Sequence, residues 1–544
     1  FPVWDEKIAL GHSVRTIAQS IELASSDLET ATSLLSLRHL AGDAELSDDL
    51  VEQSSRCWRK NRRKWLPEIV AGARDRERTN GEVAYLLEPD LKASSGGLRD
   101  INAIQWIEAS GIALLDQEQR DLRAANDVLL AARVELHRGT SRKGDVLLLE
   151  EQDSVADALG IGDADVMMSQ VAASARTITW IADDVFLRVR NDLRRLRLRA
   201  GKPRTIAENI HLVDGTVAIV AGSPVSTDQA LMLRLAVAAA ENEARLDRDS
   251  LDQLVDHGAE ITTPWSVEVR DLFVQLLLTG HRAIHVVEAL DHVGLFVRLL
   301  PEWEPNRSKV QRNQYHRFTV DRHLLEAASI ASTLTDTVDR PDLLVVGALL
   351  HDIGKGYPGD HTDVGVVLID TIAANMGFDS DDVDTLKRLC AHHLLLPDVA
   401  TRRDIEDPGT IAVVAEQVRT TSFLHLLAAL TESDSIATGP SAWTRNKAYL
   451  TGELTRSTAR WLESDGDAKL DRSFPADEHL ALMAEHDHVV LGAGHVMQIV
   501  TTDRPGLFAR VAGALALSNL NIIDAQIYVT GHKALEVLRV VDAD

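Results

Sequence analysis

The sequence predicts a mainly α-helical protein of several domains that ends in a small α+β domain. With 544 residues the chain is too long for one hydrophobic core, and this length suggests about three or four domains. Residues from about 103 to 200 are almost continuously helix-forming with few prolines, helices resume at about 226–300, and a third helical region is expected at about 315–460. The last fifty residues change character and follow the pattern strand, turn, helix, strand, strand.

The first hundred residues are expected to hold two long helices and one short strand. Apolar side chains recur every three or four positions at Ile17, Ile21, Ala24, Leu28, Ala31 and Leu35, which predicts one amphipathic helix. A second helix is expected at about 51–75, a strand at 83–87, and a loop running into a helix at 91–101. Further on, the β-rich residues 210–221 predict a short hairpin or a linker.

Polar segments separate the later regions. Pro301, Pro305 and the polar residues 306–314 precede the third helical region, and the turn-rich residues 464–478 follow it as a linker. The chain opens on Phe1 and stops directly after the strand-like residues 534–541, so we expect a fragment that is cut at both ends.

The composition narrows the function classes. Hydrophobic residues make up 45% and charged residues 26%, as in folded soluble proteins. No apolar run approaches the ~18 residues of a membrane helix, and no signal peptide is recognisable. Two cysteines, Cys57 and Cys390, form no disulfide framework and favour the reducing cytoplasm. A net charge of −26 argues against nonspecific nucleic-acid binding; basic clusters at 56–64 and 188–204 are expected to be solvated helix faces, although the first could recognise phosphate.

The most informative stretch is the run His351-Asp352-Ile353-Gly354-Lys355, followed by Gly359-Asp360-His361. Residues 343–350 before it are apolar nearly all round, which predicts a buried helix. A buried His-Asp pair needs partners, and a divalent metal ion satisfies both groups. Imidazole with carboxylate suits Mn²⁺, Fe²⁺, Zn²⁺ or, with more waters, Mg²⁺. The dipeptide alone is unspecific, because His486-Asp487 occurs later without such a setting.

Further metal ligands are expected from other helices. His323 and Asp434 are candidates for the first ion, and His361, His392 and His393 for a second one. Any single histidine is more often a surface or core residue, so the prediction depends on the whole set. Ions held in this way lower the pKa of a bound water so that it can attack phosphorus. Asp352 and Lys355 are the candidate catalytic residues, with Lys355 stabilising the phosphoryl oxygens as a point charge, which predicts phosphoester or phosphodiester hydrolysis.

These residues resemble those of the bifunctional PII uridylyltransferase/uridylyl-removing enzymes of bacterial nitrogen control. The resemblance runs over nearly the whole chain and is highly specific. Its motifs are Trp4-Asp5, Gly11-His12-Ser13-Val14-Arg15-Thr16, Gly96-Gly97-Leu98-Arg99-Asp100-Ile101, Tyr315-His316, Thr319-Val320-Asp321, Gly359-Asp360-His361 and His392-His393.

The resemblance also implies a domain plan. It places the C-terminal part of a nucleotidyltransferase domain at 1–105, a helical linker or bundle domain at 106–305, an all-helical HD phosphohydrolase domain at 306–462, and a first, incomplete ACT domain of partial ferredoxin-like fold at 490–544. The transferase remnant carries His12, Arg15, Gly96, Gly97, Arg99 and Asp100. ACT domains bind amino acids, here expected at Asp503, Gly506, Leu507 and Asn521, although an ordinary strand-to-helix turn remains the alternative.

The implied function is metal-dependent hydrolysis that removes UMP, or AMP as in some relatives, from the PII signal protein. A full-length parent would also attach the nucleotide from UTP or ATP under glutamine control. We expect an intact hydrolase half with Mg²⁺ or Mn²⁺, Fe or Zn being alternatives. The transferase half is expected to be inactive, because the Gly-Ser triphosphate loop and the strand-borne Asp-x-Asp pair that the family uses would precede Phe1, and we recognise no substitute for them within the chain.

Two alternatives stay open. One is an HD hydrolase of a free nucleotide second messenger, against which the motif at residues 96–101 speaks. The other is a noncatalytic amino-acid-sensing regulator with a structural metal, which would not need Lys355 or the additional histidines. No nucleic-acid or membrane partner is expected in any of these cases.

Overall fold

The computed structural model describes residues 11–195, 202–312, 316–464 and 474–542. The chain divides into two compact units, Phe1–Leu394 with Ala429–Trp443, and Leu395–Ala428 with Thr444–Asp544. Most of the described residues are helical, as predicted. Among them, no helix is both long and apolar enough to cross a membrane.

The N-terminal region differs from the prediction in two places. The single helix expected at 17–35 is divided into α2 (Ile17–Ser26) and α3 (Leu28–Leu35), because Asp27 accepts a hydrogen bond from the Thr30 N–H at 2.7 Å and caps α3. After α4 (Ala44–Asn80) the expected strand at 83–87 is wrong. Only isolated bridges form there, between Glu82 and Ser95 and between Leu86 and Phe318.

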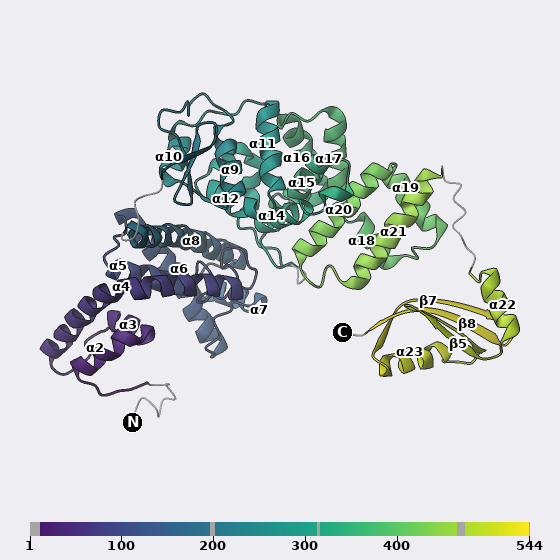
Figure 1. Cartoon of the computed structure of the whole chain (residues 1–544), viewed down its shortest axis with the longest axis horizontal. Coiled ribbons are helices and arrows are strands. Elements are labelled where there is room, and N and C mark those ends of the chain that lie inside the picture. Colours follow the sequence, from purple (N-terminus) through teal and green to yellow (C-terminus); the bar gives the residue numbers. More distant parts are fainter. Residues whose placement is uncertain (1–10, 196–201, 313–315, 465–473, 543–544) are drawn as a thin grey trace. The chain divides into compact units, whose positions relative to one another are not determined.

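The helices on both sides of residues 81–97 form a bundle. It consists of α4 together with α5 (Leu98–Ala109), α6 (Asp116–Thr140), α7 (Leu149–Ala158) and α8 (Ala164–Arg195), as Figure 1 shows. Its core gathers large apolar side chains from α4, α5, α6 and α8, including Trp58, Trp65, Leu66, Ile104, Ile107, Leu129 and Val185. The long helix α8 therefore has one side packed into the bundle.

A small sheet with helices comes next. The predicted hairpin is confirmed, because β2 (Ile210–Val213) and β3 (Thr216–Ile219) pair antiparallel. The sheet has the order β1-β2-β3-β4, with β1 at Arg204–Ala207 and β4 at Arg245–Leu246, the latter parallel to β3. The helices here are α9 (Leu231–Glu241), α10 (Arg248–His257), α11 (Val267–Leu278), α12 (His281–His292), α13 (Leu295–Leu299) and the 3₁₀ turn η1 (Pro301–Asn306).

The next region is helical throughout its described part. The first unit contains α14 (Val320–Ala331), η2 (Thr335–Thr337), α15 (Pro341–Leu350), η3 (Ile353–Gly356), α16 (His361–Asn375) and α17 (Ser380–His392). The second unit contains α18 (Leu395–Arg402), α19 (Pro408–Val418) and α21 (Arg445–Glu463), and α20 (Thr421–Thr438) runs from the second unit into the first. Helix α15 contacts α11, α14 and α17, and residues 343–350 are all buried, as their apolar pattern predicts.

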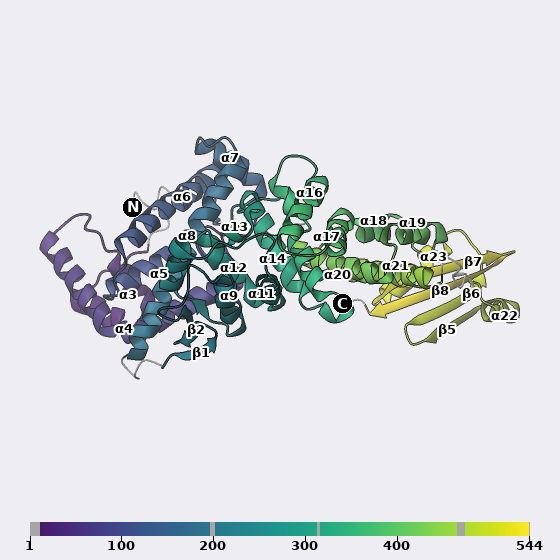
Figure 2. The same cartoon turned by 90° about the horizontal axis from the view of Figure 1, so that it is seen from above.

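The C-terminal part is an α+β structure, as predicted. It comprises α22 (Asp477–Glu485), β5 (Val489–Ala493), β6 (Val496–Thr502), α23 (Leu507–Leu517), β7 (Leu520–Thr530) and β8 (Lys533–Asp542). The four strands form an antiparallel sheet of order β5-β6-β8-β7, which Figure 2 shows from a second direction. Strand β5 is an addition to the predicted pattern. Leu515 of α23 packs on Ile499, Leu538 and Val540 of one sheet face.

Candidate metal centre

The centre begins where α15 ends. His351 is the residue that caps the C-terminus of α15, and Asp352 follows it directly before η3. A Cβ atom on Gly354 would lie 2.1 Å from the His361 carbonyl oxygen and 2.7 Å from the Gly365 nitrogen. Only glycine therefore lets η3 lie against α16, and this contact brings His361 close to Asp352.

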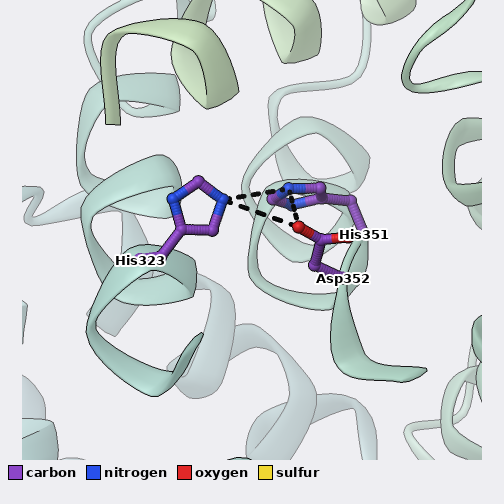
Figure 3. Close-up of side chains that lie close together, drawn as sticks. All are labelled: His323, His351 and Asp352. Atoms are coloured by element: carbon purple, nitrogen blue, oxygen red, sulfur yellow. Dashed lines mark hydrogen bonds and ion pairs between the residues drawn. The ribbon is translucent and has the colours of Figure 1, made fainter. Parts of the chain in front are cut away.

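Three buried side chains form the first group of possible metal ligands. His323 of α14 directs Nε2 toward His351 Nε2, at 3.4 Å, and toward Asp352 Oδ2, at 3.7 Å. The distance from His351 Nε2 to Asp352 Oδ2 is 3.4 Å. Figure 3 shows the two imidazoles and the carboxylate facing one another, with His323 on α14 and the other two residues in the turn after α15. Their ligand atoms all lie within 4.8 Å, so one ion could bind all three residues.

Asp434 of α20 joins this group. Its Oδ1 lies 3.1 Å from His323 Nε2 and 3.4 Å from His351 Nε2. The sequence thus identified four residues, far apart along the chain, that the fold brings together. Two imidazoles and two carboxylates are a mixed nitrogen and oxygen donor set that suits first-row divalent ions.

A second group shares Asp352. Its Oδ1 lies 3.7 Å from His361 Nε2 and 3.8 Å from His393 Nε2. This oxygen is buried and accepts no hydrogen bond from any described residue, which is costly unless a cation occupies the space beside it. His392 belongs to neither group and lies half-buried at the end of α17, so its predicted role as a ligand gains no support from the geometry.

The charges of the centre depend on one another. Burial opposes protonation of His351, but Asp352 and Asp434 outweigh it and raise the pKa of His351 to about 10. Burial opposes ionisation of Asp352, yet Lys355 and His351 hold its pKa well below the usual range. For Asp434, His351 and His323 likewise outweigh burial and lower the pKa. Burial lowers the pKa of His393 and favours its neutral form, which is the form that binds metals.

Backbone carbonyls orient two of the imidazoles. His351 Nδ1 lies 2.8 Å from the Ala348 oxygen, and His393 Nδ1 lies 2.6 Å from the Cys390 oxygen. An Nδ1–H that donates to a carbonyl leaves the lone pair on Nε2, which faces the centre in both residues. His323 Nδ1 is buried and has no such partner among the described residues.

Lys355 lies at the edge of the centre. Its Nζ is 2.5 Å from Asp352 Oδ2 and donates to Gln311 Oε1 at 2.7 Å. His316 Nε2 lies 3.5 Å from the same nitrogen, and burial together with Lys355 lowers the pKa of His316 to about 4. The sequence pattern identified Lys355 as a candidate catalytic residue but not Gln311, which belongs to none of the recognised motifs. His316 was recognised only as part of a motif.

Part of the predicted transferase remnant holds the loop before α5 together. Asp100 is 3% exposed, binds Arg76 at 2.6 Å and accepts the Gly96 N–H at 2.9 Å. Gly97 precedes α5, and Arg99 is an exposed residue of its first turn. His12 and Arg15 lie in an exposed non-helical segment before α2. Trp4, Asp5 and Tyr315 lie outside the described residues.

The predicted amino-acid site lies at the turn between β6 and α23. Gly506 precedes α23 with a φ of +75°, a conformation that favours glycine, and Leu507 is the first helical residue. Asp503 donates its N–H to the His532 oxygen at 2.9 Å, and Asn521 is an exposed residue near the start of β7. The turn is formed as expected, and ligand binding there stays a prediction.

Known protein families match three segments of the chain. The family described as GlnD PII-uridylyltransferase matches residues 67–186, the HD domain matches 320–431, and the ACT domain matches 495–544. The HD match implies that a divalent metal ion binds, and each of the two groups of possible ligands fits such an ion.

Curated relatives agree with these matches. A protein of Streptomyces coelicolor named bifunctional uridylyltransferase/uridylyl-removing enzyme is 42% identical over 500 residues, which cover 89% of this chain and 60% of the relative. A Mycobacterium tuberculosis protein of the same name is 37% identical over 545 residues, covering 97% of this chain and 67% of the relative. The chain thus spans 60 to 67% of the length of these two relatives.

Proposed function

Since the chain belongs to the family of bifunctional uridylyltransferase/uridylyl-removing enzymes, we propose that it removes a uridylyl group from the PII signal protein by metal-dependent hydrolysis. The observation that carries the proposal is the convergence of His323, His351 and Asp352, which lie inside the HD match at 320–431, with Asp434, which lies just beyond it. Lys355 beside these ligands adds a cation for an anionic substrate.

The metal is proposed to be Mn²⁺ or Mg²⁺, and the donors would also accept Fe²⁺ or Zn²⁺. His323, His351, Asp352 and Asp434 would hold one ion, and Asp352, His361 and His393 a second one. A bound divalent ion would supply Lewis acidity and make water acidic enough to attack phosphorus near neutral pH.

The side chains of the chain perform the remaining tasks. Lys355 Nζ points a positive charge at the centre, where it would stabilise the charge that develops on the phosphoryl oxygens. Gln311 fixes that ammonium group by accepting a hydrogen bond at 2.7 Å. The attack forms a new P–O bond to water and breaks the phosphodiester bond to the PII side chain, so UMP leaves and the side-chain hydroxyl is restored.

For the transferase motif we propose a structural role in this chain. The Asp100 carboxylate is already engaged by Arg76 and by the Gly96 N–H, which fastens the loop before α5.

The test is incubation of the whole chain with uridylylated PII and Mn²⁺, with UMP quantified by chromatography. His351→Ala should abolish release, whereas the matched variant His486→Ala, in the second His-Asp dipeptide, should release UMP at the parent rate. A parallel reaction with adenylylated PII identifies the base. If the Mn²⁺-bound parent releases neither nucleotide from PII, the proposal is wrong. Cleavage of free nucleotides instead would support a second-messenger hydrolase.

A further inference from the structure

The helix that carries His323 is fastened at its first turn by a cluster of buried charges, here called the clamp. The clamp consists of Asp321 and Arg322 of α14, Arg176 of α8, Glu82 of the loop after α4, and Glu288 and Asp291 of α12. Asp321 and Arg322 are the two residues directly before His323. Any movement of the clamp therefore moves the first turn of α14 and the ligand on it.

Arg176 binds two carboxylates at once. One of its terminal nitrogens donates to Asp291 Oδ2 at 2.9 Å, and the other donates to Asp321 Oδ2. The Ser308 N–H donates to the same Asp321 oxygen at 2.8 Å. The side chains of Arg176 and Asp321 are 10% and 4% exposed, so water screens their interaction weakly.

Arg322 fastens the same turn from the other side. Its guanidinium binds Glu82 at 2.9 Å and Glu288 at 2.6 Å, besides Glu326 of its own helix. Both arginines contact the Tyr85 ring, whose centroid lies 5.1 Å from the Arg176 guanidinium carbon and 4.8 Å from the Arg322 guanidinium carbon. The clamp thus joins α14 to α8, to α12 and to the loop after α4.

Three residues of the clamp border a cavity. Glu82, Arg176 and Glu288, together with Tyr85, are among the residues that line this space of about 620 Å³. Apolar packing alone therefore does not fix the positions of the side chains beside this cavity. Ion pairs and hydrogen bonds must fix their positions, and with them the position of α14.

His323 depends on its helix more than His351 and His393 do. His351 and His393 are each oriented by a hydrogen bond from Nδ1 to a carbonyl oxygen. His323 Nδ1 is buried without a hydrogen-bond partner among the described residues. Such outer contacts normally fix a histidine ligand, so the placement of His323 must come from the backbone of α14.

We propose that Arg176 is a positioning residue of the metal centre, which through Asp321 holds His323 Nε2 toward the other ligands. The proposal rests on the metal centre of the proposed function and is independent of its substrate. Arg176 lies in the segment that matches the uridylyltransferase family, whereas His323 lies in the HD match. The helical bundle thus completes the hydrolase centre, and the HD segment alone would hold metal weakly.

The test compares Mn²⁺ binding by calorimetry in whole-chain variants that circular dichroism shows to be folded. Arg176→Met removes the contact to Asp321. Asp321→Asn removes the charge of this ion pair from the other side and leaves Arg176 paired with Asp291, so no buried charge is stranded. The matched control is Arg188→Met on the same helix, which breaks ion pairs to Glu118 and Asp184, both at 2.5 Å.

Both clamp variants should raise the Kd for Mn²⁺ roughly 10–100-fold, the usual effect of losing a residue that orients a metal ligand. The double variant should bind Mn²⁺ no more weakly than the single variant with the higher Kd, because both substitutions disrupt the same interaction. Arg188→Met should keep the parent Kd. Parent-like binding by folded Asp321→Asn, or equal weakening by Arg188→Met, would overturn the proposal. If the parent binds Mn²⁺ and releases no UMP, only the proposed function fails; if the parent binds no Mn²⁺, both fail.

Discussion

Metal binding should be strongly pH-dependent because His351 must lose a proton to become a ligand. Asp352 and Asp434 outweigh the opposing effect of burial and raise the pKa of His351 to about 10 in the metal-free protein. At pH 7 to 8.5 the imidazole is therefore charged before binding and neutral afterwards. The carboxylates of Asp352 and Asp434 have lowered pKa values and are already ionised, so they release no proton.

The release of one proton sets the magnitude of this pH dependence. The association constant should rise tenfold per pH unit, equivalent to about 1.4 kcal/mol, and thus roughly 30-fold between pH 7 and 8.5. Calorimetric titration with Mn²⁺ in two buffers of different ionisation enthalpy counts the protons directly. In Asp434→Asn the slope should flatten toward pH 8.5, because one of the two carboxylates facing His351 is gone. An affinity that is constant from pH 7 to 8.5, with enthalpies independent of the buffer, would refute the reasoning.

The same pKa shift affects the stability of the metal-free protein. The pKa of His351 is higher in the folded than in the unfolded chain, so its stabilising contribution is complete below about pH 6.5 and is lost as the pH rises toward 10. Asp352 and Asp434 act oppositely, because their pKa values are lowered by folding. Their contribution is present above about pH 4 and is lost on acidification. Thermal unfolding without metal at pH 6 and pH 9.5 should thus show a lower Tm at the higher pH.

Three other changes have defined outcomes. Gly354→Ala should lower the free energy of unfolding by about 3 kcal/mol or more and weaken Mn²⁺ binding, because its Cβ would lie 2.1 Å from the His361 oxygen. Chemical denaturation with and without Mn²⁺ measures both effects, and a variant of full stability would contradict the contact. Lys355→Met should lower kcat for UMP release roughly 10²–10³-fold without weakening Mn²⁺ binding, and an unchanged kcat would remove Lys355 from the mechanism. Burial raises the pKa of the Cys390 thiol to about 12, so iodoacetamide should alkylate Cys390 only after unfolding, and rapid labelling of the native protein by mass spectrometry would contradict its burial.

Local sequence patterns were sufficient to predict structure where a residue's environment follows from its neighbours in sequence. Residues 343–350 are apolar on every side, so α15 had to be buried, and the His-Asp pair after it had to find partners. The turn at Gly506 was equally predictable, because glycine tolerates the φ of +75° found there. The break at Asp27 was missed because the apolar spacing of α2 continues into α3, and the capping side chain interrupts the helix without changing that spacing.

The sequence by itself indicated the kinds of candidate ligand, their order along the chain and the helical nature of the region that holds them. Only the tertiary structure decided that His393 rather than His392 faces Asp352, since neighbouring residues of a helix point about 100° apart and the pattern does not say which one faces inward. The contact between Arg176 and Asp321, which are 145 residues apart, was also beyond the sequence. Such an ion pair depends on how helices from distant segments pack, and no local periodicity records that packing.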